Sequence, residues 1–102
     1  MPEFATPFSV KKSDRKLTKE ELIRAIRFSI ASEYEAIQLY EEIQESIDDE
    51  KSKKLLEEIA EDEKIHVGNF LYLLKQLSPE ESEFYGEGVQ EAEKIIKESK
   101  KD

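Results

Sequence analysis

Apolar residues recur at alternating steps of three and four along most of this chain, which is the period of an amphipathic helix. The repeat begins at Thr18 and Glu21, a Thr-x-x-Glu pair that is typical of a capping box at a helix N-terminus. It predicts a helix over residues 18–47, about 45 Å long at 1.5 Å per residue. The main row of this helix is Leu22, Ile26, Ser29, Glu33, Ala36, Tyr40, Ile43 and Ile47, and its flanking row is Ile23, Ile30 and Ile37.

A second run of the same repeat follows a short break at residues 48–51. Because the break is so short, we expect the second helix to fold back antiparallel to the first. This helix should end at Ser78-Pro79, since proline disfavours helical geometry in the residue before it. Its main row is Ser52, Leu56, Ile59, Glu63, His66, Phe70, Leu73 and Leu77, and its flanking row is Ala60, Val67 and Leu74.

The chain after the second helix carries a weaker helical signal. Ser78 and Pro79 are typical of a new helix start, but Gly86 and Gly88 punctuate the segment that follows. We therefore expect a short last helix over about residues 89–99. Its apolar content is thin, so it needs a partner surface. Those apolar residues are Val89, Ala92, Ile95 and Ile96.

The predicted fold is all-α, with three parts in sequence. Residues 1–17 carry two prolines and no helical period, and we expect a flexible N-terminal arm. Residues 18–78 form the antiparallel two-helix hairpin, and residues 79–102 form a C-terminal helical segment. Because only 37% of the 102 residues are apolar, partner subunits should supply part of the buried surface.

The charge of the chain narrows its partners. Sixteen basic and 25 acidic residues give a formal net charge of −9, which predicts no binding to nucleic acid or to anionic membranes. No apolar run has the length of a membrane span, so we expect a cytoplasmic protein. The absence of cysteine excludes thiolate zinc sites and iron–sulfur centres from this sequence.

Three residues with metal-binding side chains interrupt the apolar main rows: Glu33 in the first helix, and Glu63 and His66 in the second. A buried carboxylate without a partner destabilises a fold by several kcal/mol, so such groups are usually neutralised, paired or bound to metal. Glu33 lies about as far before the turn as Glu63 lies after it. The two should face each other across the antiparallel seam, with His66 one turn further along.

This set is half of a di-iron site. Carboxylate-bridged di-metal centres in four-helix bundles take one Glu from each of two helices and a Glu-x-x-His pair from each of the others. A second copy of the chain would supply the missing half, so the sequence predicts a homodimer that forms the four-helix bundle. Iron accepts this mixture of carboxylate and imidazole ligands. The alternative is a core histidine that bonds to Glu33 or Glu63 and only fixes the register of a structural oligomer.

The segments EYEAIQLY (residues 33–40) and DEKIH (residues 62–66) resemble the encapsulated ferritin-like proteins of the ferritin and rubrerythrin group. The resemblance implies a hairpin that dimerises into a ferritin-like four-helix bundle. It also implies a decameric ring of dimers and ferroxidase activity inside an encapsulin nanocompartment. Glu33, Glu63 and His66 match the iron ligands of that family.

Two further positions match the family pattern. Tyr40 matches a tyrosine beside the centre, although core packing is the simpler explanation for it, and Glu35 matches an acidic residue that helps metal reach the site. Leu39 and Ser32 depart from the pattern, which weakens the assignment of Glu35. The sequence therefore predicts a ferroxidase that oxidises iron(II) with dioxygen and feeds iron storage. A structural hairpin oligomer and a rubrerythrin-like peroxide-reducing protein are the alternatives.

Overall fold

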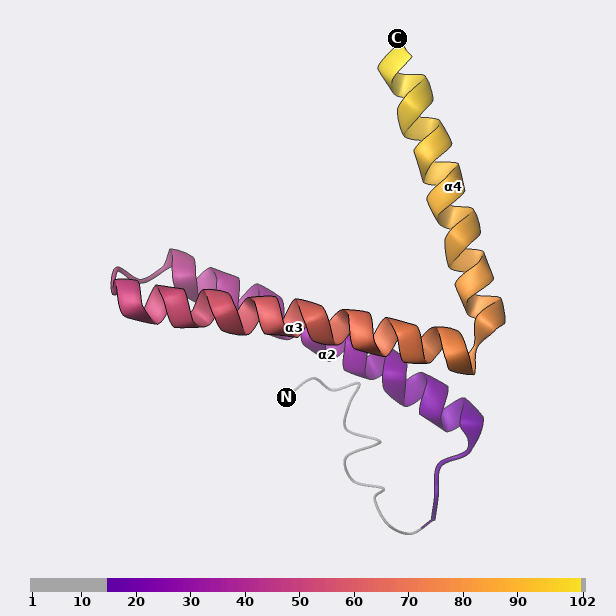
Figure 1. Cartoon of the computed structure of the whole chain (residues 1–102), viewed down its shortest axis with the longest axis horizontal. Helices are drawn as coiled ribbons and strands as arrows, with labels where there is room; N and C mark the ends of the chain where they lie inside the picture. Colours follow the sequence, from indigo (N-terminus) through magenta and orange to yellow (C-terminus); the bar gives the residue numbers. More distant parts are fainter. Residues whose placement is uncertain (1–14, 102) are drawn as a thin grey trace.

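The computed structural model describes residues 15–101, which fold into three helices and no strand (Figure 1). These are α2 (Lys19–Glu45), α3 (Glu50–Leu77) and α4 (Pro79–Lys101). Helices α2 and α3 run antiparallel and side by side, and they form the predicted hairpin. The all-α expectation is therefore confirmed. The arm expected over residues 1–17 lies almost entirely outside the described residues.

Helix α2 begins with the predicted capping box. The Thr18 side chain accepts a hydrogen bond from the Glu21 backbone N–H, and the Glu21 carboxylate accepts one from the Thr18 N–H. Arg15 reinforces this start through an ion pair with Glu21 at 2.6 Å. The Arg15 hydrogen bond lowers the pKa of Glu21 to about 2, so the cap stays charged in mild acid. The helix ends at Glu45, two residues before the position that the sequence predicts.

Helix α3 begins at a second side-chain cap, in which Asp49 accepts a hydrogen bond from the Ser52 N–H. This cap satisfies an amide that the first turn of a helix leaves without a partner. The helix ends where expected, and the Ser78 N–H donates to the Leu74 carbonyl at 2.7 Å. The turn between the caps is short enough to place the middle of α2 against the middle of α3.

The core of the hairpin lies mainly between the flanking rows of α2 and α3, and Ile26 of the main row joins it. Glu33 and its neighbours on the main rows sit beside this seam, where most of them are half-buried and several are exposed. The main rows therefore line one side of the hairpin that no part of the described chain covers completely. The buried residues are Ile26, Ile30, Ile37, Ala60, Val67 and Leu74.

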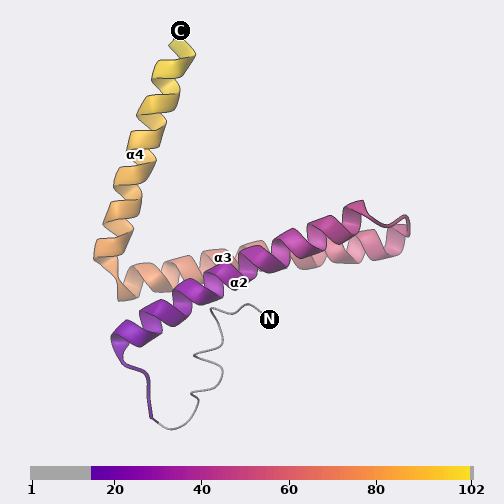
Figure 2. The ribbon, with the colours of Figure 1, turned by 180° about the vertical axis from the view of Figure 1, so that it is seen from behind.

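Helix α4 corrects the expectation of a short helix over residues 89–99. It begins directly at Pro79 and runs unbroken for 23 residues through Gly86 and Gly88. A glycine in a helix interior costs up to about 1 kcal/mol relative to alanine, which does not suffice to end this helix. Figures 1 and 2 show that α4 projects away from the hairpin. All described side chains from residue 83 to residue 99 are exposed.

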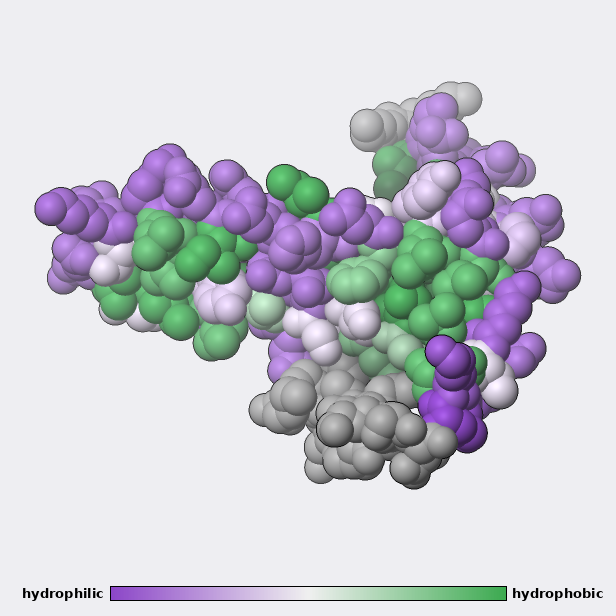
Figure 3. All heavy atoms as spheres, turned by 60° about the horizontal axis from the view of Figure 1, so that its bottom comes forward, coloured by the Kyte–Doolittle hydropathy of each residue, from purple (hydrophilic) through white to green (hydrophobic). Residues whose placement is uncertain are grey.

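Apolar side chains reach the surface in more than one place. Figure 3 shows one apolar area toward the α2–α3 turn and another beside the base of α4. Tyr34, Leu71, Tyr72 and Tyr85 are among the large side chains that are more than two-fifths exposed. No helix among residues 15–101 is both long and apolar enough to span a membrane.

Candidate metal centre

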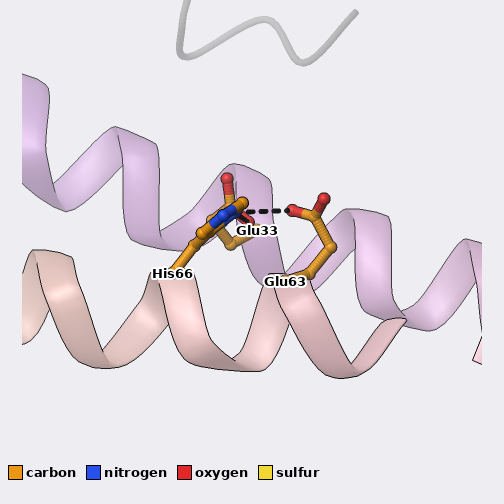
Figure 4. Close-up of side chains that lie close together, drawn as sticks. All are labelled: Glu33, Glu63 and His66. Carbon is orange, nitrogen blue, oxygen red and sulfur yellow. Dashed lines mark ion pairs between the residues drawn. The ribbon is translucent and has the colours of Figure 1, made fainter. Parts of the chain in front are cut away.

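Glu33, Glu63 and His66 converge at the middle of the hairpin. Glu33 comes from α2, and Glu63 and His66 come from consecutive turns of α3 (Figure 4). One ligand atom from each residue lies within 4.8 Å of the other two, which is close enough for a shared ion. The expected juxtaposition across the seam is therefore present, and the i, i+3 spacing explains why Glu63 and His66 share a side of α3.

The imidazole of His66 lies between the two carboxylates. Its Nδ1 atom is 3.4 Å from Glu33 Oε2 and 3.8 Å from Glu63 Oε2. The side chains of Glu33 and Glu63 are each 19% exposed, whereas that of His66 is 50% exposed. The carboxylates thus lie mostly inside the protein, and the imidazole forms the open edge of the cluster.

Glu33 is the least satisfied member of this cluster. Its Oε2 atom is buried and has no hydrogen-bond partner. Burial raises the pKa of Glu33, and the nearby Glu63 carboxylate raises it further, while His66 acts in the opposite direction. A cation placed among the three ligand atoms would neutralise this carboxylate and give its orphaned oxygen a partner.

The donor set fits iron. Two carboxylates and one imidazole are oxygen and nitrogen ligands of the kind that non-haem iron accepts. Lys64, the cationic neighbour of Glu63 in the sequence, pairs instead with Glu41 at 3.1 Å. Within residues 15–101, no further His, Asp or Glu joins the group, so one chain offers three ligands. The three side chains that the sequence predicts to converge do lie together, and their role as half of a metal site stays a prediction.

The other two predicted site residues are not part of the cluster. Glu35 is exposed on α2 and does not belong to the convergent group. Tyr40 is half-buried on the main row, seven residues and therefore about two turns after Glu33. Tyr40 thus shares a side of α2 with Glu33, whereas Glu35 faces solvent. Their roles at a metal centre remain predictions.

The sequence analysis did not predict a polar cluster that lies at the end of the hairpin away from the α2–α3 turn. Arg27 of α2 pairs with Glu81 of α4 at 2.5 Å, and the Tyr85 hydroxyl donates a hydrogen bond to the same carboxylate. Arg27 and Glu81 are 54 residues apart, and the Arg27 position is exposed while Glu81 is half-buried. No periodic pattern signals such a contact, because the direction of α4 decides it.

Comparison with known proteins gives this arrangement a context. Residues 25–102, which include most of α2 and all of α3 and α4, match the rubrerythrin family. The chain belongs to the rubrerythrin family. Members of this family are typically oxidoreductases that use iron, which agrees with the iron-compatible ligands of the cluster.

Relatives of this rubrerythrin-family chain are associated with encapsulins. It is 39% identical over 82 residues to a ferritin-like–encapsulin shell fusion protein of Pyrococcus furiosus, covering 80% of this chain and 24% of the relative. It is 36% identical over 76 residues to the encapsulin nanocompartment cargo protein EncC of Myxococcus xanthus, covering 74% of this chain and 58% of EncC. The chain therefore spans about a quarter of the first relative and somewhat over half of the second.

A solved structure confirms the fold of this family member. The encapsulated ferritin domain from Pyrococcus furiosus matches with a TM-score of 0.80 and 37% identity, covering 85% of this chain and 89% of that domain. The resemblance to encapsulated ferritin-like proteins, inferred above from two short segments, is thus confirmed over most of the chain.

Proposed function

We propose that this rubrerythrin-family protein is a ferroxidase that oxidises iron(II) with dioxygen at a centre shared by two copies of the chain. The observation that carries the proposal is the buried, unpartnered Oε2 of Glu33 beside Glu63 and His66. Three potential ligands that meet inside an apolar row are better suited to a cation than to water. The family membership and the encapsulin-associated relatives support the same function.

Each residue has a distinct task in this proposal. Glu33 and Glu63 bind iron(II) as substrate and offset its charge, and their carboxylates can bridge two ions in a shared centre. His66 supplies a nitrogen ligand from the edge of the cluster that is open in the single chain and that faces the second copy in the proposed centre. Tyr40 packs beside the centre on the same side of α2, and Glu35 attracts the cation from solvent.

A second copy of the chain completes the centre. A single hairpin provides three ligands, and its half-buried main rows lie beside them without full cover. Pairing two hairpins on these rows gives a four-helix bundle with two Glu-x-x-His pairs and two further carboxylates. It also removes the apolar rows from water, which is the main driving force for such an association. We also propose that these dimers assemble into the decameric ring that the family resemblance implies.

An encapsulin compartment is the proposed setting for this activity. Two relatives carry an encapsulin association in their names, one as a cargo protein and one as a fusion to the shell. An open ring of hairpins has no storage cavity of its own. We therefore propose that the protein converts iron and that a surrounding shell retains the oxidised product. Co-expression with an encapsulin and measurement of co-purified iron would test this setting.

An iron oxidation assay tests the proposed function. Glu33→Gln, Glu63→Gln and His66→Gln each remove one ligand while largely keeping side-chain size, so each should lower the rate of iron(II) oxidation by dioxygen at least about tenfold. Glu61→Gln is the matched control, because it removes an exposed carboxylate from α3, the helix that carries Glu63 and His66. Near wild-type rates in all three ligand variants, with assembly intact, would refute the ferroxidase proposal.

Peroxide reduction is the second candidate, and the rubrerythrin family membership favours it specifically. The same three ligands would serve, with hydrogen peroxide in place of dioxygen. Single-turnover oxidation of protein-bound iron(II) by each oxidant separates the two functions. A faster reaction with dioxygen supports the ferroxidase, whereas a reaction with peroxide alone supports the second candidate. Failure of both, together with assembly that ignores iron, would favour a purely structural oligomer.

A further inference from the structure

Asp62 directly precedes Glu63 on α3, and the proposed centre gives this aspartate no task. Its side chain is exposed, and it forms no ion pair with another residue between positions 15 and 101. Lys64, the nearest cation in the sequence, pairs with Glu41 at 3.1 Å instead. Asp62 therefore offers an uncommitted carboxylate about one helical turn from His66, the only histidine of the chain.

The imidazole of His66 approaches the two glutamates through a single nitrogen. Both ion-pair contacts, 3.4 Å to Glu33 and 3.8 Å to Glu63, are made by Nδ1 (Figure 4). Neither contact is a hydrogen bond, because Glu33 Oε2 has no hydrogen-bond partner and the distance to Glu63 is too long. Nδ1 thus faces the space between the carboxylates. This position suits a lone pair that binds a cation better than an N–H that donates to either oxygen.

The other ring nitrogen, Nε2, then needs an acceptor. A neutral imidazole carries its proton on one nitrogen and a lone pair on the other, so a ligating Nδ1 leaves the N–H on Nε2. A metal-bound histidine almost always donates this second N–H, and the acceptor fixes both the tautomer and the orientation of the ring. Within the described chain, Nε2 has no such partner. The His66 side chain is 50% exposed, so an acceptor can reach it.

Helical geometry selects Asp62 as this acceptor. Side chains on a helix lean toward its N-terminus and lie over the residues three and four positions earlier. For His66 these residues are Glu63 and Asp62, and around the helix His66 lies between them. Glu63 is on the Nδ1 side, and Asp62 is on the other side, with its Cβ about 5–6 Å from that of His66. Asn69, three residues after His66, is the competing neighbour, but the ring leans away from it.

We propose that Asp62 accepts a hydrogen bond from Nε2 of His66 and thereby keeps the lone pair of Nδ1 directed between Glu33 and Glu63. Asp62 is a positioning residue, because it acts through the imidazole and does not bind iron itself. Its purpose rests on the metal centre proposed above, whereas the contact joins two residues of one helix and requires neither iron nor a second copy. In the purely structural alternative, His66 donates from Nδ1 to Glu33, which requires the opposite tautomer.

Nitrogen NMR of the imidazole tests the contact, and the single histidine makes the spectrum unambiguous. The metal-free whole chain is labelled with isotopic histidine in alkaline buffer, where the ring is neutral, and long-range correlations identify the protonated nitrogen. We expect the proton on Nε2 in the wild type. In Asp62→Ala it should move toward Nδ1, because Glu33 and Glu63 then compete for it. Asp62→Asn keeps an acceptor oxygen and should keep the wild-type tautomer, and Asn69→Ala should keep it as well. A wild-type proton on Nδ1 would overturn the proposal, and so would an unchanged tautomer in Asp62→Ala.

Zinc(II), which has no redox chemistry, tests the consequence for metal binding. Asp62→Ala should raise the dissociation constant for zinc(II) about tenfold, at the lower end of the effect of such acceptors. Glu58→Ala is the matched control, because it removes an exposed carboxylate one turn earlier on α3 and so costs the same charge. Equal weakening in the two variants would overturn the proposal, as would wild-type affinity in Asp62→Ala. A wild type that binds no zinc(II) would count against the metal centre itself, and the tautomer would still decide the role of Asp62. Neither measurement follows iron oxidation, so a failed ferroxidase assay is a separate result.

Discussion

Glu33 Oε2 lies 3.4 Å from His66 Nδ1, and this contact joins α2 to α3 at the middle of the hairpin. The same carboxylate oxygen is buried without a hydrogen-bond partner. A buried polar atom left unsatisfied costs about 1–3 kcal/mol. The cluster should therefore destabilise the metal-free protein and stabilise the metal-bound protein, which is how a binding site differs from a structural ion pair.

The sign of the Glu33→Gln effect distinguishes these two cases. In metal-free protein at neutral pH, this change removes a poorly satisfied charge and should raise the free energy of unfolding by about 1 kcal/mol. With manganese(II) added, the order should reverse, because the wild type gains a ligand interaction that the variant lacks. Urea unfolding with and without metal measures both differences. The control is Glu42→Gln, an exposed change on the same helix, which should stay within about 0.5 kcal/mol of the wild type. A metal-free Glu33→Gln that is clearly less stable would instead identify a stabilising Glu33–His66 pair.

Metal should raise the melting temperature by mass action. At a free concentration one hundred times the dissociation constant, manganese(II) stabilises the bound state by about 2.7 kcal/mol, which corresponds to a rise on the order of 10 °C in a chain of this size. His66→Gln should lose most of this rise, because it removes the nitrogen ligand. Asn69→Ala, an exposed change on the same helix, should retain it. Thermal scans at two protein concentrations also show whether the bound state is a dimer, and an identical rise in His66→Gln would exclude His66 as a ligand.

The candidate centre could be predicted from sequence because its geometry is local to one hairpin. Glu33 and Glu63 stand at nearly equal distances from a short turn, and the antiparallel pairing of α2 and α3 then decides their meeting. The main and flanking rows of apolar residues on each helix could also be predicted from the sequence. The sequence pattern does not indicate which of the two rows is buried within one chain. The structure buries most of the flanking rows together with Ile26, and it leaves the rest of the main rows, with the three ligands, beside the seam.

Helix α4 was the part that sequence reasoning described least well. Gly86 and Gly88 suggested a break, because glycine has a low helix propensity, but the flanking residues continue the helix across both. Its direction depends on the contact of Arg27 with Glu81. Exposed charged residues occur throughout this chain, so their pattern carries no information about which two will meet across 54 positions.

Two adjacent leucines of α3 distinguish the core of the hairpin from the proposed dimer surface. Leu74 is 3% exposed in the core, and Leu74→Ala should lower the free energy of unfolding by about 2–5 kcal/mol. Leu73 is 39% exposed and lies seven residues after His66, on the side that is proposed to face a second chain. Leu73→Ala should cost less than about 1 kcal/mol in the monomer but should weaken the dimer. Urea unfolding and analytical ultracentrifugation separate these effects. A Leu73→Ala variant that dimerises as tightly as the wild type would move the proposed interface away from the main rows.

Acid should release α4 from the hairpin through Glu81. The hydrogen bond from Arg27 lowers the pKa of Glu81, and the Tyr85 hydroxyl and Ser78 lower it further, while burial opposes them. Because the pKa is lower in the folded state, the stabilisation by this carboxylate is fully present above its unfolded value of about 4.3 and is lost as the pH falls through the lower, folded value. The gain is about 1 kcal/mol or less, because Arg27 is half exposed and solvent screens the pair.

Spin labels attached through Glu58→Cys on α3 and Lys94→Cys on α4 measure this release in metal-free protein. The distribution of the distance between the two labels should stay narrow from pH 7 to pH 5 and should broaden only in stronger acid. Arg27 remains protonated throughout this range, and the pKa of Tyr85 is raised, so neither partner titrates there. Glu81 is then the only member of the cluster whose charge changes. Glu81→Gln should give a broad distribution that does not depend on pH across the same range. Broadening of the wild type already at pH 6 would assign the release of α4 to a different group.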